Sequence, residues 1–189
     1  MPTQTKENYL KAVYFLNQKQ ADISITALAG LMNVSKPTAN SMVKKMEEKG
    51  WLLYEKYKPL ILTSKGEEMG ALIVRKHRLT EMFLSEVMSF GWEEVHDIAE
   101  EMEHLNSEKL FDRMDEILGF PTVDPHGSPI PDKNGKISKP SYTNLTAAKV
   151  GDVVKVVALG KSSKELLLYL NKKSIKLGTQ LSVNNVEKF

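Results

Sequence analysis

Cysteine is absent from the 189 residues of this chain. Its absence excludes disulfide bonds and cysteine-based zinc fingers, and it agrees with a reducing compartment. Long hydrophobic runs are absent too, which argues against a membrane-spanning helix, and the first residues lack the apolar stretch of a signal peptide. We therefore expect a cytoplasmic protein with no membrane partner.

Net charge is small, at +2, but it is unevenly distributed along the chain. Residues 1–76 carry 12 Lys and Arg against 7 Asp and Glu, residues 77–118 carry 3 against 12, and residues 119–189 carry 11 against 5. A basic first part followed by an acidic middle indicates that the first part binds a polyanion and that the middle binds cations.

The acidic middle contains a predicted helix over residues 92–104. At about 3.6 residues per turn, one arc carries the apolar side chains of Val95, Ile98, Ala99 and Met102. The neighbouring arc carries imidazoles and carboxylates, from His96, Glu100, Glu103 and His104. Upstream, His77 and Glu81 lie one helical turn apart. Such ligands without thiolates suit Mn, Fe, Zn or Ni, so the pattern predicts a metal site; a merely solvated acidic face is the alternative.

The basic first part is predicted to contain a helix-turn-helix. An amphipathic helix over residues 5–19 precedes a short helix around Leu28, a left-handed turn at Asn33 and a second helix capped by Ser35. Small residues, Ala29 and Ala39, allow the two helices to cross closely. In this layout the second helix enters the DNA major groove, although an ordinary helical hairpin fits the pattern almost as well.

Two short strands, 51–55 and 59–63, are predicted after this motif, and they favour the DNA-binding alternative. A basic hairpin behind a helix-turn-helix is a winged helix, whose wing can lie along phosphates. The side chains expected to neutralise phosphates are Lys44, Lys45, Lys56 and Lys58. The residues expected to meet DNA at the start of the second helix are Ser35, Lys36, Pro37, Thr38, Asn40 and Ser41.

The remaining sequence predicts two more helices, a linker and a small β-rich domain. A capping box at Ser64 opens a long helix to about Val87. A helix over 107–118 carries enough apolar surface to form a dimer contact, although packing on its own domain fits almost as well. Five of the eight prolines lie between residues 121 and 140, which indicates an extended, partly ordered linker, with His126 as a turn residue. Strands are expected over 152–159, 165–170 and 180–186, so that the fold class is mainly α with a small C-terminal barrel.

Several of these segments together resemble the diphtheria-toxin-repressor and manganese-transport-regulator family of metal-dependent repressors. The segments that carry the resemblance are residues 9–10 with Tyr14, 34–38, 62–66, 75–79, 95–97, 103–104, 119–121 and 129–131. The resemblance implies a winged helix-turn-helix domain over 1–73, an α-helical metal-binding and dimerisation domain over 74–140 with a Pro-rich linker from residue 120, and an SH3-like β-barrel over 141–189.

The resemblance also implies two metal sites per subunit. The residues that match the ancillary site of the family are His77, Glu81 and His96, and those that match its primary, regulatory site are Glu100, Glu103 and His104. The first-helix ligand falls on Asn8, with Glu7 as a nearby substitute, and Glu165 matches a ligand that the third domain of some members adds. Lys11 stands where one manganese-sensing subgroup has a bridging Glu, which argues against a close metal pair.

The function that the resemblance implies is transcriptional repression of metal-homeostasis genes by a homodimer on a double-stranded DNA operator. The activating ion is Mn(II) or Fe(II), and Zn(II), Co(II) or Ni(II) are expected to substitute in vitro. No enzymatic activity and no small-molecule substrate are expected. The alternatives are a metal-independent winged-helix regulator and a metallo-hydrolase, for which no His-Glu-x-x-His motif is present.

Overall fold

The computed structural model describes residues 3–19, 22–138 and 141–187. The chain divides into two compact units: Met1–His77 with Glu103–Asn106 and Pro131–Ile137 form unit 1, and Arg78–Met102 with Ser107–Ile130 and Ser138–Phe189 form unit 2. Within the described ranges, no helix is both long enough and apolar enough to cross a membrane.

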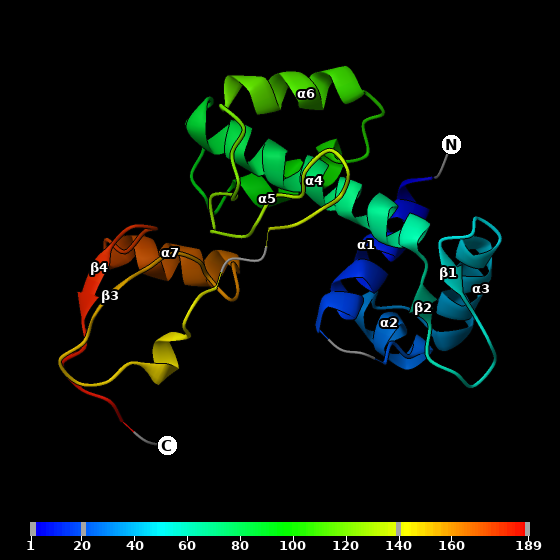
Figure 1. Ribbon diagram of the computed structural model, residues 1–189, viewed down its shortest axis with the longest axis horizontal. Helices are drawn as coiled ribbons and strands as arrows, with labels where there is room; N and C mark the ends of the chain where they lie inside the picture. The colour runs from blue at the N-terminus through cyan, green and yellow to red at the C-terminus, as the bar shows by residue number, and fades with distance from the viewer. Residues whose placement is uncertain (1–2, 20–21, 139–140, 188–189) are drawn as a thin grey trace. The chain divides into compact units, whose positions relative to one another are not determined.

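Unit 1 contains three helices and a β-hairpin, followed by the first part of a long helix (Figure 1). These elements are α1 (Gln4–Lys19), α2 (Ile25–Leu31), α3 (Lys36–Glu47), β1 (Leu52–Leu53), β2 (Ile61–Leu62) and α4 (Ser64–Glu86), of which residues up to His77 belong to this unit. β1 and β2 pair antiparallel, with Leu52 opposite Leu62. The winged helix-turn-helix arrangement predicted from the sequence is therefore confirmed.

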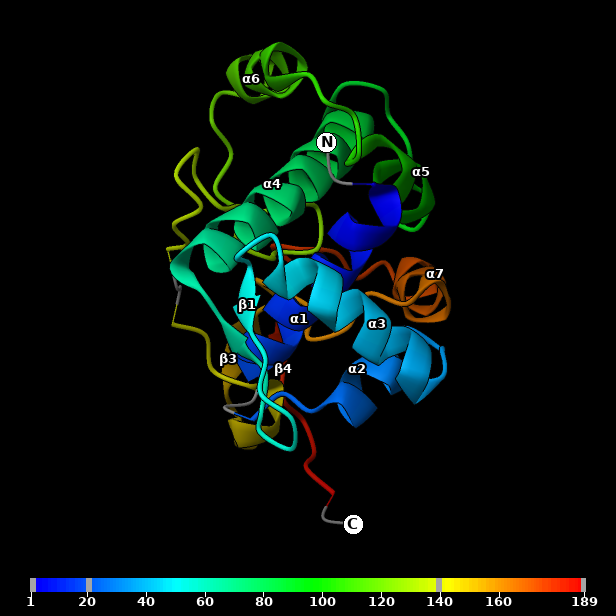
Figure 2. The ribbon, with the colours of Figure 1, turned by 90° about the vertical axis from the view of Figure 1, so that its right-hand side faces the viewer.

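Local sequence determines the turn between α2 and α3, which Figure 2 shows from the side of these helices. The Ser24 hydroxyl caps α2, and Asn33 takes a left-handed conformation with φ 50° at the turn. The Ser35 hydroxyl then accepts a hydrogen bond from the Thr38 amide at 3.3 Å and caps α3. Ala29 and Ala39 are both buried, as the predicted close crossing requires.

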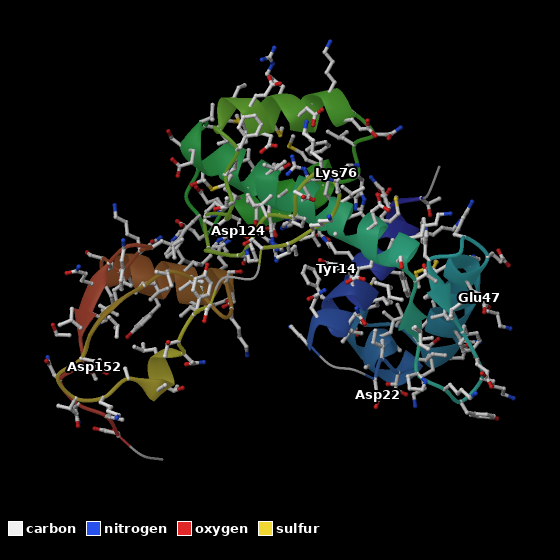
Figure 3. All side chains as sticks on the ribbon, viewed as in Figure 1. Tyr14, Asp22, Glu47, Lys76, Asp124 and Asp152 are labelled. Carbon is white, nitrogen blue, oxygen red and sulfur yellow. The ribbon has the colours of Figure 1, made fainter. Side chains whose placement is uncertain are left out.

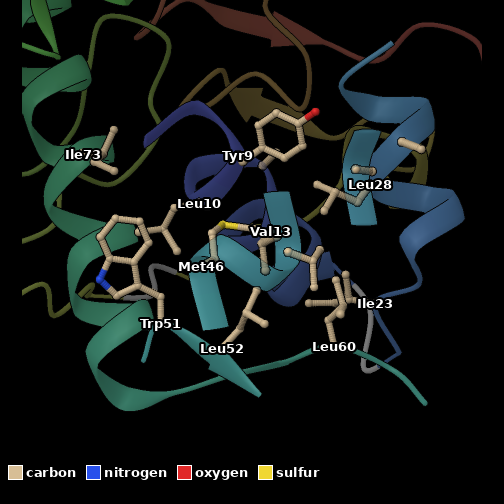
Figure 4. Close-up of a cluster of buried hydrophobic side chains, with 14 residues drawn as sticks. Tyr9, Leu10, Val13, Ile23, Leu28, Met46, Trp51, Leu52, Leu60 and Ile73 are labelled. Atoms are coloured by element: carbon tan, nitrogen blue, oxygen red, sulfur yellow. The ribbon is translucent and has the colours of Figure 1, made fainter. Parts of the chain in front are cut away.

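A single hydrophobic core holds α1, α2, α3 and the hairpin together (Figure 4). Its fully buried members include Leu10, Val13, Leu28, Met46 and Leu52. Burial of each such aliphatic side chain stabilises the fold by about 1.5–3 kcal/mol. α1, α3 and the hairpin thus share one core, so a displacement of α1 is expected to displace α3 as well.

The N-terminus of α4 differs from the predicted capping box. Thr63, rather than Ser64, supplies the cap, because its hydroxyl oxygen accepts a hydrogen bond from the Gly66 amide at 3.0 Å. Gly66 lies so close to the hairpin that a Cβ atom there would be 1.8 Å from the carbonyl oxygen of Trp51. A side chain at position 66 would therefore separate α4 from β1.

Unit 2 begins with the second part of α4 and adds α5 (Val95–Met102) and α6 (Glu108–Ile117). The helix predicted over 92–104 is longer than α5. α5 begins only at Val95, because residues 91–94 form a turn in which the Gly91 amide donates a hydrogen bond to the Glu94 carboxylate at 2.8 Å. It ends early, so that Glu103 and His104 lie in the turn that follows and contact other parts of unit 1.

Residues 123–129 of the Pro-rich stretch form a folded loop rather than an extended segment. Val123 forms an antiparallel bridge with Pro129, and the side chains of Asp124 and His126 between them are buried. Arg78 on α4 donates a hydrogen bond to the carbonyl oxygen of Pro129, which fixes the end of this loop. Pro140, also part of the predicted linker, lies outside the described residues.

The C-terminal segment of unit 2 contains a 3-10 turn (Leu145–Ala147), β3 (Val153–Lys155), α7 (Lys164–Lys172) and β4 (Gln180–Ser182). β3 and β4 pair antiparallel. The prediction of a strand over 165–170 is wrong, because unbranched Leu, Lys and Glu favour a helix that the Ser163 hydroxyl caps. In the described range 141–187 the only sheet is this two-stranded one, so a closed barrel is not confirmed.

Candidate metal centre and nucleic-acid interface

The start of α3 presents the predicted DNA-contacting residues on the surface of unit 1. All of them are exposed except Asn40, which is half-buried. The Ser35 hydroxyl is engaged in the helix cap and lies 2.8 Å from the Thr38 hydroxyl. Lys36, Lys44 and Lys45 add exposed positive charge along the same helix. Side chains that reach out from a rigid helix in this way suit groove recognition.

The wing adds a second basic surface. Lys56 lies 4.9 Å from the centroid of the Tyr57 ring, and Lys58 forms an exposed ion pair with Glu55 at 2.8 Å. Tyr57 is 92% exposed and has a left-handed backbone, with φ 68°, which projects it from the tip. The hairpin therefore carries two ammonium groups and an aromatic ring into solvent, where phosphate contacts are possible.

Glu103 is the buried centre of the acidic cluster in unit 1. It is fully buried, and both of its carboxylate oxygens lie within hydrogen-bond distance of Lys11 Nζ, at 2.6 and 2.8 Å. His77 Nδ1 lies 2.7 Å from Glu103 Oε2. The Lys11 ammonium thus supplies a positive charge beside Glu103, at the position where by resemblance one subgroup has a bridging Glu and a close metal pair.

His104 contacts α1 as well. Its Nδ1 atom lies 2.6 Å from Glu7 Oε2, and its Nε2 atom lies 3.7 Å from Glu103 Oε1. Asn8, the next residue on α1, has a buried side-chain oxygen that accepts no hydrogen bond from the described residues. An orphaned oxygen, a buried carboxylate and an imidazole are a donor set that suits a divalent cation, so the residues of unit 1 fit a metal ligand role.

Unit 2 brings Glu81 together with a histidine that the sequence analysis assigned only to a turn. His126 is 3% exposed, and its Nδ1 atom lies 3.9 Å from Glu81 Oε2 and 4.0 Å from Asp124 Oδ1. One ligand atom from each of Glu81, Asp124 and His126 lies within 4.8 Å of the others. Asp124 lies beside α4 in Figure 3. This buried cluster is a candidate cation site that the sequence analysis missed.

The orientation of His126 supports this interpretation. Its Nε2 atom lies 2.8 Å from the carbonyl oxygen of Trp92, which can only accept a hydrogen bond. Nε2 must therefore carry the proton, and the lone pair of a neutral ring is on Nδ1, facing the carboxylates. The Trp92 ring stacks on His126, with the ring centroids 6.1 Å apart. The signal in the sequence was the spacing of Asp124 and His126, two residues apart in a turn.

Electrostatics in this cluster also favour a cation. Burial raises the pKa of Asp124 above its usual value, and the neighbouring Glu81 carboxylate raises it further. A backbone hydrogen bond from Ser128 and the charge of Arg78, whose Nε is 3.6 Å from the carboxylate, act in the opposite direction. A divalent ion would relieve the repulsion between the two buried carboxylates.

The other predicted ligands are found in both units, and their contacts are described within each. His96 in unit 2 is 62% exposed at its side chain, with Nδ1 3.3 Å from Glu81 Oε1. Glu100 is half-buried on α5. Glu165 is exposed in the first turn of α7, where a backbone hydrogen bond and the Ser163 hydroxyl lower the pKa of its carboxyl group. Whether these residues ligate metal stays a prediction.

Comparison with known proteins places the chain in a family. Residues 1–60 match the family described as "Iron dependent repressor, N-terminal DNA binding domain", and residues 63–132 match "Iron dependent repressor, metal binding and dimerisation domain". The HTH-type transcriptional regulator MntR of Oceanobacillus iheyensis is 32% identical over 120 residues, which cover 64% of this chain and 81% of that protein. The chain belongs to the iron-dependent repressor family.

Other relatives in the iron-dependent repressor family include both iron- and manganese-dependent proteins. The iron-dependent repressor IdeR of Mycobacterium leprae is 38% identical over 127 residues, which cover 67% of this chain and 55% of that protein. The chain thus spans about half the length of the mycobacterial relatives that it matches. A manganese-dependent transcriptional repressor solved in complex with manganese has a TM-score of 0.82 and 35% identity, covering 95% of this chain and 83% of that one. ScaR with bound Cd²⁺ has a TM-score of 0.77 and 32% identity, covering 95% and 82%.

Proposed function

We propose that this chain is a metal-activated, DNA-binding transcriptional repressor that controls metal-ion homeostasis genes. The observation that carries the proposal is the contact between the acidic turn and α1. Glu103 and His104 follow the acidic helix in the sequence, yet they bind Lys11 and Glu7 on α1, which shares its core with the recognition helix. Side chains that suit a cation are therefore attached directly to the DNA-binding unit.

The proposed activating ion is Mn(II) or Fe(II). Relatives named as iron-dependent and as manganese-dependent repressors support both choices, and the nitrogen and oxygen donors of this chain suit both. Zn(II), Co(II) and Ni(II) should substitute in vitro, because nitrogen and oxygen sites generally bind them more tightly than Mn(II) or Fe(II). When bound, the ion supplies positive charge among carboxylates that otherwise repel one another.

Two ligand sets are proposed for each subunit. The regulatory set comprises Glu100, Glu103 and His104 together with the Asn8 oxygen. The second set is built on Glu81, and two alternatives for its partners are open. The resemblance supports His77 and His96, whereas the contacts within unit 2 support Asp124 and His126. Glu165 remains a candidate addition to the second set.

DNA recognition is assigned to α3 and the wing. The α3 N-terminus would contact base edges, and Lys44, Lys45, Lys56 and Lys58 would contact phosphates of a double-stranded operator. A homodimer would present two such units to two half-sites at a fixed separation. For a dimer contact, α6 offers Ile117 near its end, which is 55% exposed, and Phe120 just after it, which is 62% exposed, whereas Phe111 and Met114 are buried within the chain. Metal binding would favour the dimer in its DNA-competent state.

The finer assignments complete the proposal. We assign residues 141–189 to an SH3-like module, of which β3, β4 and α7 would form part, and we place the protein in the cytoplasm. Neither a membrane nor a small-molecule substrate is a proposed partner. The metallo-hydrolase alternative is disfavoured because the family is one of repressors. An experiment must distinguish the proposed metal-activated repressor from a metal-independent winged-helix regulator.

Fluorescence anisotropy on promoter DNA from a manganese or iron transporter gene provides the test. Binding is measured at fixed salt, first with chelator and then with Mn(II), Fe(II) and Zn(II) titrated. Metal-dependent binding is expected. Glu103→Gln should abolish this activation while sedimentation still shows a dimer, since Glu103 binds α1 directly. Binding that is indifferent to metal would leave the winged helix but refute metal regulation.

A further inference from the structure

The contact between His104 and Glu7 suggests a role for Glu7 that differs from direct metal ligation. Glu7 Oε2 lies 2.6 Å from His104 Nδ1, and the two side chains are only 14% and 5% exposed. Both residues belong to unit 1, whose α1 carries Glu7. A short, shielded contact of this kind fixes the orientation of an imidazole ring.

The contact also fixes which ring nitrogen is available. An ionised carboxylate only accepts hydrogen bonds, so His104 Nδ1 must carry the proton that is donated to Glu7. In a neutral ring the lone pair is then on Nε2, which lies 3.7 Å from Glu103 Oε1. Histidines that bind metals typically donate their other N–H to a carboxylate in this way, which orients the ring and raises the basicity of the free nitrogen.

We propose that Glu7 is a positioning residue that acts through His104 and is not itself a metal ligand. This inference rests on the proposed function. Glu7 Oε2 already accepts the His104 hydrogen bond, whereas the neighbouring Asn8 Oδ1 is buried and accepts no hydrogen bond from the described residues. The proposal couples α1 to the ion through the oriented imidazole of His104.

The two roles of Glu7 predict different results for two substitutions. Glu7→Gln keeps a side-chain oxygen that can accept the Nδ1 proton, whereas Glu7→Ala removes it. Nitrogen-15 NMR of the imidazole rings in metal-free protein reports the tautomer of His104. Competition with a chelating dye reports the affinity for Zn(II), which serves as a diamagnetic probe. Glu101→Gln, at an exposed carboxylate close in the sequence, is the control for the lost charge.

In the wild type we expect the Nδ1-protonated tautomer. Glu7→Ala should lose the preference for this tautomer and weaken Zn(II) binding by about 10–100-fold, as removal of such orienting partners does. Glu7→Gln should keep the tautomer and most of the affinity, and Glu101→Gln should keep both. Circular dichroism confirms that each variant is folded.

Two results would overturn the positioning role. The first is a Glu7→Gln variant that keeps the tautomer but loses as much affinity as Glu7→Ala, because the carboxylate would then be a ligand itself. The second is a Glu7→Ala variant with wild-type tautomer and affinity. Wild-type protein that binds Zn(II) but whose DNA binding ignores metal would instead refute the proposed function, so the two failures are distinguishable.

Discussion

At the scale of single residues, the histidines of this chain differ in the group that contacts the imidazole ring and in how far that ring is shielded from solvent. His104 is bound to a carboxylate and His126 to a backbone carbonyl oxygen, and both rings are shielded from solvent. His96 is mostly exposed, and its Nδ1 atom lies 3.3 Å from Glu81 Oε1. A ring that is oriented before the ion arrives loses less conformational entropy on binding, so His126 is better prepared as a ligand than His96.

This difference predicts which histidine holds the second ion beside Glu81. Isothermal titration with Mn(II) should give two equivalents per chain for the wild type. His126→Asn should lose one equivalent and His96→Asn should keep both, because His126 already lies among the buried carboxylates of Glu81 and Asp124. The opposite pattern would assign the second ion to the ligand set of the resemblance, with His77 and His96.

Lys11 gives a prediction about stability without metal. Lys11→Met leaves the fully buried Glu103 carboxylate with His77 Nδ1 close to it but without the ammonium. Removal of one partner from a buried ion pair costs about 3–5 kcal/mol, so the free energy of unfolding in urea with chelator should fall by about 3 kcal/mol.

Two matched variants control for this effect. Lys19→Met, at an exposed position on the same helix, should change stability by less than about 0.5 kcal/mol. In the double variant Lys11→Met/Glu103→Met most of the lost stability should return, since no charge is left unpaired. A single Lys11→Met variant as stable as the wild type would show that Glu103 does not depend on the ammonium.

At the scale of elements, the sequence predictions were accurate where the residues that determine an element lie next to it in the sequence. The caps at Ser24 and Ser35 and the left-handed Asn33 lie next to the turns that they determine, and the helix-turn-helix was predicted correctly. The end of α5 has a distant cause: Glu103 binds Lys11, 92 residues away in the chain. The spacing of residues in the sequence cannot reveal such a contact. The helix predicted over 92–104, which was expected to carry all four ligands, is therefore longer than α5.

The α7 error has a different origin. Residues 165–170 read as a strand because they are apolar and short, but leucine is unbranched at Cβ and has a good helix propensity. The Ser163 cap was present in the sequence and would have indicated a helix. The cluster of Glu81 with His126 could be predicted only in part, since it requires the Pro-rich loop to fold back on α4.

The two lysines of the wing are expected to contribute to DNA binding through contacts with phosphates. Lys56→Ala/Lys58→Ala should weaken operator binding about equally on specific and random DNA. If both ammonium groups contact phosphates, the slope of log K against log salt should become less steep by about 1.8, because each contact contributes about 0.9. Lys161→Ala, at an exposed lysine in the C-terminal segment, is the control and should leave the slope unchanged. An unchanged slope in the wing variant would show that the hairpin does not touch the DNA backbone.

At the scale of the whole molecule, hydrogen bonds join the C-terminal segment to the rest of unit 2, and two of them lie close to His126. The Trp92 indole N–H donates to Asn171 Oδ1 on α7 at 2.8 Å, and the Leu159 amide donates to the His126 carbonyl oxygen at 2.9 Å. Both contacts involve residues next to the buried cluster of Glu81, Asp124 and His126. Release of the segment should therefore disturb that cluster as well.

A substitution of Gly127 tests the contact between the C-terminal segment and the loop that carries His126. A Cβ atom there would lie 2.3 Å from the carbonyl oxygen of Val157, and its φ of +85° disfavours any other residue. Gly127→Ala should push Val157 and Ala158 away, and faster hydrogen exchange is expected at the Leu159 amide, which bonds to the neighbouring His126. The control is Gly160→Ala, where a Cβ atom would have nothing within 4 Å. Because His126 is positioned by the same turn, Gly127→Ala should also weaken the second Mn(II) equivalent, whereas Gly160→Ala should not. Faster exchange without any loss of Mn(II) affinity would mean that the segment covers the cluster but does not hold it in place.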